Sequence, residues 1–158
     1  MPKPFSIVRA QQSDYQNIIS LLEHVKVPTN GINFSFTRFL VIRFHDEDII
    51  GGCIGLELYG TNALLRSFAI HPKYQGSGLG RILVQKLLEV AAQNDVNDVF
   101  LLTTKADSMF RKFGFSETQC STIPKEIGEN DLFRIAGLPT ARCMVKRGIV
   151  QDETSFFR

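Results

Sequence analysis

The clearest periodic pattern in the chain lies between residues 78 and 93, where hydrophobic positions recur with the spacing of an α-helix. The apolar residues that share one face are Leu79, Ile82, Leu83, Leu87, Val90 and Ala91. Polar residues occupy the opposite face, as expected of a helix that packs against a sheet. The pattern therefore predicts an amphipathic helix over Gly78–Gln93.

Runs rich in β-branched and aromatic residues predict the strands. These runs are Phe5–Arg9, Arg38–His45, Ile49–Tyr59, Ala63–Ile70, Asp98–Thr104, Phe115–Glu117 and Thr140–Lys146. Short turns at 46–48 and 60–62 join the second, third and fourth runs, which predicts three consecutive antiparallel strands. The strand after the long helix should lie parallel to the strand before it.

The remaining segments are less regular. Ser13 is a candidate cap for a first helix, and Ala106–Phe113 predicts a short helix that ends at Gly114. Asn33–Thr37 is either a short second helix or a loop. Residues 121–139 form either a loop or a covering helix around Pro124–Ile127.

Length and charge limit the possible functions. The chain has 158 residues, which fit a single domain over 1–158. Its net charge of +2 argues against nucleic acid as a partner. The absence of a long apolar segment near the start argues against membrane binding and predicts a cytoplasmic location.

The cysteines and histidines carry no pattern of a metal site. Cys53, Cys120 and Cys143 are an odd number at wide spacing, so we expect buried small hydrophobic residues rather than a disulfide or a metal centre. The three histidines also lack metal-ligand spacing.

A glycine-rich turn precedes the long helix. Residues 71–81 read His-Pro-Lys-Tyr-Gln-Gly-Ser-Gly-Leu-Gly-Arg. Backbone amides at such a helix start point outward and bind anions, most often phosphate. Arg81 replaces the third glycine of a dinucleotide fingerprint, and no Gly-Lys-Ser/Thr triplet follows Gly76. The alternative is a left-handed turn without a ligand.

The spacing Gln75-x-x-Gly78-x-Gly80, after a strand that ends Phe68-Ala69-Ile70, resembles the central motif of the GNAT family of N-acetyltransferases. The segment Met109–Phe115 resembles a second motif of that family. The resemblance spans Phe5–Arg147. It implies an α/β (α+β) acyl-CoA N-acyltransferase fold: a mixed, mostly antiparallel sheet of six to seven strands, flanked by helices, with a splayed central pair of parallel strands.

The resemblance also implies acetyl-CoA as cosubstrate and no metal. The implied coenzyme-binding residues are Phe68, Ala69, Ile70, Gln75, Gly76, Ser77, Gly78, Leu79, Gly80, Arg81 and Phe110. The amides of residues 75–81 would hold the pyrophosphate, and main-chain groups of Phe68 and Ile70 would pair with the pantetheine arm.

The usual acid and base of the family are missing. Leu64 stands where many relatives carry a glutamate, and Phe110 where many carry a tyrosine. Glu57 and Tyr59 are the nearest substitutes on the adjacent strand, where they share a face if Leu56 and Leu58 face the core. Glu57 is otherwise a solvent-facing carboxylate.

Arg66 is costly to bury alone on a central strand. It either pairs with Glu57 or grips a substrate carboxylate. We therefore predict a catalytic group of Glu57, Tyr59 and Arg66.

Short matches at 64–67, 101–104 and 141–146 resemble small acetyltransferases of amino acids and related amines, including the group associated with arsenic resistance. The sequence thus predicts an N-acetyltransferase acting on a small primary amine. The alternatives are acetylation of a protein N-terminus or lysine, and a coenzyme A-binding module without catalysis. The family often forms homodimers, although nothing in this sequence demands one.

Overall fold

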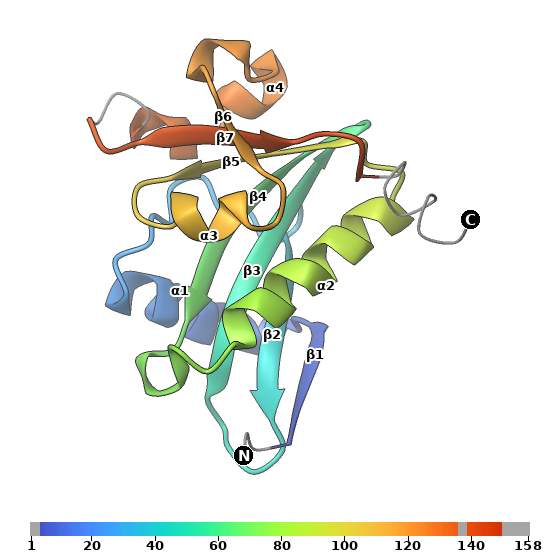
Figure 1. The fold of residues 1–158 in the computed structure, drawn as a ribbon. Helices are drawn as coiled ribbons and strands as arrows, with labels where there is room; N and C mark the ends of the chain where they lie inside the picture. The colour runs from blue at the N-terminus through green and yellow to red at the C-terminus, as the bar shows by residue number, and fades with distance from the viewer. Residues whose placement is uncertain (1–3, 136–138, 150–158) are drawn as a thin grey trace.

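The computed structural model describes residues 4–135 and 139–149. A seven-stranded mixed sheet forms its centre (Figure 1). The strands are β1 (Phe5–Arg9), β2 (Arg38–Phe44), β3 (Ile50–Tyr59), β4 (Asn62–Ile70), β5 (Asp98–Thr103), β6 (Ser116–Thr118) and β7 (Arg142–Lys146). Their order is β1-β2-β3-β4-β5-β7-β6, and only β4 and β5 pair in parallel. The predicted sheet is confirmed.

Within the described residues, four α-helices accompany the sheet. They are α1 (Tyr15–His24), α2 (Leu79–Gln93), α3 (Asp107–Arg111) and α4 (Lys125–Gly128). Short 3-10 helices cover Gln12–Asp14, Pro72–Tyr74, Cys120–Thr122 and Asp131–Ile135. The longest helix begins one residue after Gly78, close to the predicted start. Figure 1 shows α1 and α2 on opposite faces of the sheet.

The two faces of the sheet bury different kinds of side chain. Under α2, a single large cluster includes Leu56, Leu65, Leu83 and Leu87. The other face has two smaller clusters, one under α1 and one under the segment that contains α4. Glu57, Thr37 and Arg66 are buried as well. Since Glu57 and Arg66 follow residues of the α2 cluster in their strands, alternation places them on the face with the two smaller clusters.

The parallel pair separates along its length. The register joins β4 to β5 only at Asn62, Ala63 and Leu64, whereas β4 runs on to Ile70 and β5 to Thr103. Beyond residue 64, the main chain of β4 therefore has no ladder partner in β5. The predicted splay of the central strands is confirmed.

One local prediction was wrong, and one segment that the sequence left open is resolved. Ser13 does not cap the first helix; instead the buried Asp14 carboxylate accepts a hydrogen bond from the Gln11 amide at 2.8 Å. Asp14 also receives two bonds from Arg43, at 2.7 and 2.9 Å, which offset the cost of burying it. The stretch Asn33–Thr37 forms turns rather than a helix.

The expectation for the cysteines was wrong at two positions. Cys120 and Cys143 form a disulfide that joins the segment before α4 to β7, with a Cα–Cα distance of 5.3 Å. The wide spacing of Cys120 and Cys143 did not indicate a disulfide, because their contact depends on tertiary folding. Cys53 is a buried free thiol, as predicted, and burial raises its pKa to about 12.

Reduction of this disulfide should lower the free energy of unfolding by about 3 kcal/mol, since the bond closes a loop of 23 residues in the unfolded chain. Urea unfolding with and without a phosphine reductant measures the difference. Thiol counting in denaturant should find one free thiol before reduction and three after it. Three thiols before reduction would contradict the pairing.

Among the described helices, none is both long and apolar enough to span a bilayer. The location of the protein in the cell stays a prediction.

Candidate active site

The glycine-rich turn forms the start of α2. Gly76 and Gly78 have φ angles of 79° and 86°, in the left-handed region that favours glycine. Gly78 immediately precedes the first helical residue, Leu79. The first amides of a helix have no intrahelical acceptor and lie at the positive end of its dipole. This turn is therefore suited to a phosphate group.

A cavity of about 490 Å³ opens along the turn. Most of the predicted coenzyme-binding residues line it, namely Phe68, Ala69, Ile70, Gln75, Gly76, Gly78, Gly80 and Arg81. Three predicted residues do not: Leu79 is buried in the core, the Ser77 hydroxyl donates to the Tyr74 carbonyl at 2.5 Å, and Phe110 is buried beside a different cavity. Most of the residues that the sequence analysis assigned to coenzyme binding thus line one cavity.

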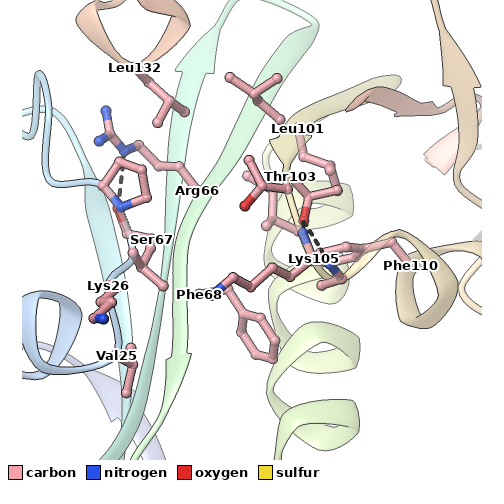
Figure 2. Close-up of a pocket in the computed structure, with 16 residues that line it drawn as sticks. Val25, Lys26, Arg66, Ser67, Phe68, Leu101, Thr103, Lys105, Phe110 and Leu132 are labelled. Carbon is pink, nitrogen blue, oxygen red and sulfur yellow. Dashed lines mark hydrogen bonds between the residues drawn. The ribbon is translucent and has the colours of Figure 1, made fainter. Parts of the chain in front are cut away.

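A second cavity of about 140 Å³ lies where β4 and β5 separate. Figure 2 shows Arg66, Ser67 and Phe68 on one side, with Leu101, Thr103 and Phe110 opposite. Val25, Val27, Phe68 and Ala106 line both cavities. The two cavities are thus neighbours along one path that leads from the glycine turn into the gap between the parallel strands.

The main chain of β4 is distorted at this gap. Ser67 has a φ of 57°, and the register between β3 and β4 shifts between Cys53 and Gly55. A non-glycine residue in this region is strained and requires support from its surroundings. The Ser67 hydroxyl supplies part of that support, because it accepts a bond from Arg66 Nε at 3.1 Å.

Glu57 and Arg66 form a buried ion pair. Their side chains are 1% and 0% exposed, and Arg66 Nη1 lies 3.6 Å from Glu57 Oε2. Glu57 also accepts bonds from the Thr37 hydroxyl at 2.6 Å, the Tyr59 hydroxyl at 2.9 Å and Asn130 Nδ2 at 2.8 Å. The solvent-facing interpretation of Glu57 is therefore wrong, and its sharing of a face with Tyr59 is confirmed.

The nitrogen atoms of the Arg66 guanidinium donate hydrogen bonds to other groups of the protein. Besides Ser67, it donates to Asn130 Oδ1 at 3.0 Å and to the Asn30 carbonyl. Burial lowers the pKa of Arg66, and Glu57 opposes that shift. The sequence left two roles open for Arg66, an ion pair with Glu57 or binding of a substrate carboxylate, and the structure contains the ion pair.

Burial also raises the pKa of the Tyr59 phenol to about 12. Its proton is therefore retained through the neutral range and is donated to Glu57. Glu57 and Tyr59 are not among the residues that line the cavity between the strands. The predicted catalytic group is brought together, but only Arg66 reaches the cavity.

Two residues of this network escaped the sequence analysis. Asn130 belongs to a stretch without period, and Thr37 lies at the end of the ambiguous segment. No local signal indicated either residue, since both reach Glu57 only through tertiary folding.

No group of three or more potential metal ligands forms within residues 4–135 and 139–149.

The sequence profile described as the acetyltransferase (GNAT) family matches residues 8–115. The chain belongs to this family. Its GNAT fold is shared with the N-acetylglutamate synthase of Neisseria gonorrhoeae solved with coenzyme A and N-acetylglutamate, with a TM-score of 0.75 and 20% identity over 93% of this chain and 36% of that one. A GNAT-family acetyltransferase of Staphylococcus aureus gives a TM-score of 0.72 and 15% identity, over 91% of this chain and 99% of that one.

Curated relatives are similar at somewhat higher identity. An uncharacterised N-acetyltransferase of Chlorobaculum tepidum is 32% identical over 113 residues, which cover 71% of this chain and 64% of that protein. An amino-acid acetyltransferase of Vibrio atlanticus is 32% identical over 91 residues, or 56% of this chain and 20% of that protein. The match thus covers less than two thirds of each relative.

Proposed function

We propose that this GNAT protein is an acetyl-CoA-dependent N-acetyltransferase that acts on the primary amine of a small molecule. The observation that carries the proposal is the path from the glycine turn into the gap between β4 and β5. The turn suits a pyrophosphate, and the gap offers to an extended arm main-chain groups of β4 that β5 does not pair. When bound, acetyl-CoA supplies an activated thioester carbonyl.

The coenzyme would lie along the two cavities. The amides of Gly76–Arg81 would hold its pyrophosphate, with Gln75 and the side chain of Arg81 at the same opening. Main-chain groups of Phe68–Ile70 would pair with the pantetheine arm. Phe110 is 3% exposed and packs edge-on against Phe68 at 6.0 Å, so it would form an apolar wall where the arm ends.

Acetyl transfer forms a carbon–nitrogen bond and breaks a carbon–sulfur bond, so the amine loses a proton and the sulfur gains one. Phe110 and Leu64 can neither donate nor accept it. Protonation of the thiolate by solvent is feasible, because a thiol is a moderately weak acid. We propose that Glu57, Tyr59 and Arg66 act together, with Arg66 at the cavity and the other two fixing its charge and position.

The acceptor should be an amine that also carries a carboxylate, such as an amino acid. Lys26 and Lys105 line the second cavity, and none of the described residues that line it is acidic, whereas the charge of Arg66 is already paired with Glu57. Its volume of about 140 Å³ suits a small molecule. A basic peptide would be repelled. Curated relatives named amino-acid acetyltransferases support this substrate class. A homodimer stays a prediction.

Thiol release from acetyl-CoA, followed across a panel of amino acids, polyamines and peptides, tests this proposal. We expect saturable turnover with one or more free amino acids, and an acetylated product 42 mass units heavier, about the mass that an acetyl group adds in place of hydrogen. Turnover with peptides alone would overturn the small-molecule assignment. Saturable coenzyme binding without turnover on any amine would favour a non-catalytic module.

A further inference from the structure

We propose that Asn130 is a positioning residue that sets acceptor affinity by joining the two chain segments around the second cavity to the buried Glu57–Arg66 pair. This inference rests on the proposed function, since it concerns the acceptor end of the same site. Asn130 follows α4, in a segment whose hydrophobic residues show no helical or strand period. Its side chain is nevertheless the most connected amide at this site.

The Asn130 amide uses both of its ends. Its Nδ2 donates to Glu57 Oε1 at 2.8 Å. Its Oδ1 accepts from Arg66 Nη1 at 3.0 Å and from the Leu132 main-chain amide at 2.9 Å. A single side chain thus contacts both members of the ion pair and fixes the main chain two residues further on.

These contacts reach the cavity through Leu132. The Leu132 side chain lines the cavity near Arg66, as Figure 2 shows. The hydrogen bond from the Leu132 main-chain amide to Asn130 Oδ1 holds this part of the cavity wall in place relative to Arg66. A shift of the wall changes the shape of the space available to an acceptor.

The loop between α1 and β2 meets Asn130 from the opposite side. Gly31 has a φ of 73°, and a Cβ built there would lie 2.7 Å from Asn130 Oδ1. The preceding carbonyl, of Asn30, accepts from Arg66. The same loop begins with Val25–Pro28, which line the cavity. Asn130 and Arg66 therefore connect two segments that are about 100 residues apart in sequence.

A neutral amide satisfies these partners together. Glu57 requires a donor, whereas Arg66 and the Leu132 amide require an acceptor. Aspartate is close in shape but offers acceptors alone, and it would place a second carboxylate against Glu57. The charged and titratable groups around this position are Glu57 and Tyr59 from β3, Arg66 from β4 and the neighbouring Asp131, which pairs with Arg134 at 3.4 Å.

The decisive variant is Asn130→Asp. Two carboxylates in this buried site compete for one proton, which raises the pKa of the pair. At high pH they repel and the bridge is lost, while at lower pH the shared proton restores it. We expect the KM for the acceptor to rise about tenfold at pH 8 and to return toward the wild-type value near pH 6, with kcat changed less than about threefold.

Two controls separate positioning from general damage. Glu129→Gln changes the neighbouring exposed residue, whose partner Lys125 is also exposed, and should leave both kinetic constants unchanged. The double variant Glu57→Gln/Asn130→Asp exchanges the amide and the carboxylate between the two positions. The amide introduced at position 57 can then donate to the carboxylate introduced at position 130, which restores one hydrogen bond between them. It should recover a substantial part of the lost affinity and lose the added pH dependence.

A further readout does not depend on activity. Asn130→Ala removes the acceptor of the Leu132 amide, so hydrogen exchange at that amide should become about tenfold faster, while coenzyme A affinity stays within about twofold. If the wild type acetylates no amine, the proposed function fails and the exchange rate still tests the bridge. Unchanged exchange in Asn130→Ala would overturn the inference. So would an Asn130→Asp variant with the wild-type KM and pH profile.

Discussion

Arg66→Met is expected to lower the free energy of unfolding by about 3–5 kcal/mol, because it leaves the Glu57 carboxylate buried without its counter-ion. The remaining partners of Glu57 are neutral donors, which compensate only part of the loss. Methionine keeps the apolar length of the side chain, so little cavity forms. Urea unfolding monitored by circular dichroism measures the change.

Removal of both charges provides the matched comparison. Glu57→Leu/Arg66→Met should be destabilised by less than the sum of the two single variants, because no unpaired charge remains. A surface pair, Lys86 and Glu89, lies 3.4 Å apart with both side chains nearly half exposed. Its disruption should cost less than about 1 kcal/mol. If Arg66→Met lowers the free energy of unfolding no more than the surface variant does, the Glu57 carboxylate is solvated in the absence of Arg66.

Gly78→Val is expected to weaken coenzyme A binding at least about tenfold, because a β-branched residue strongly resists the left-handed backbone at this position. No atom lies within 4 Å of a Cβ built at Gly78, so strain rather than collision displaces the turn. The displaced turn no longer aims its amides at the pyrophosphate. Isothermal titration with coenzyme A measures the loss.

Gly60→Val is the control for strain alone. Gly60 has a φ of 65° and equally open surroundings, but it lies in the turn between β3 and β4. This variant should lose similar stability and retain coenzyme affinity. Equal affinity losses in both variants would show that general destabilisation, rather than the phosphate turn, causes the effect.

The parts of the fold that could be predicted depend on local pattern. The long helix after Gly78 has a helical period, and the splayed strand before it is a mostly apolar run of nine residues, so each could be recognised from neighbouring residues. The path for the coenzyme followed from these elements, because turn, helix start and strand end are adjacent in sequence. The family resemblance then implied a mixed sheet with a splayed central pair of parallel strands.

The parts that could not be predicted depend on contacts between distant segments. Asn130 reaches Glu57 across 73 residues, and Thr37 reaches it across 20. The disulfide joins Cys120 to Cys143 where Ile123, Ile127 and Leu132 pack against β5 and β7. No period marks such contacts, so the surroundings of Glu57 stayed open between a buried and an exposed carboxylate.

We propose that the turn at the start of α2 and the separated end of β4 form one coenzyme site. Titration of ¹⁵N-labelled protein with coenzyme A, followed by amide chemical shifts, tests it most directly. We predict saturable shifts concentrated at the amides of Gly76–Arg81 and Phe68–Ile70. Saturable binding whose shifts lie elsewhere, for example around the separate cavity that His24 and His71 line, would show that coenzyme A binds at a different site.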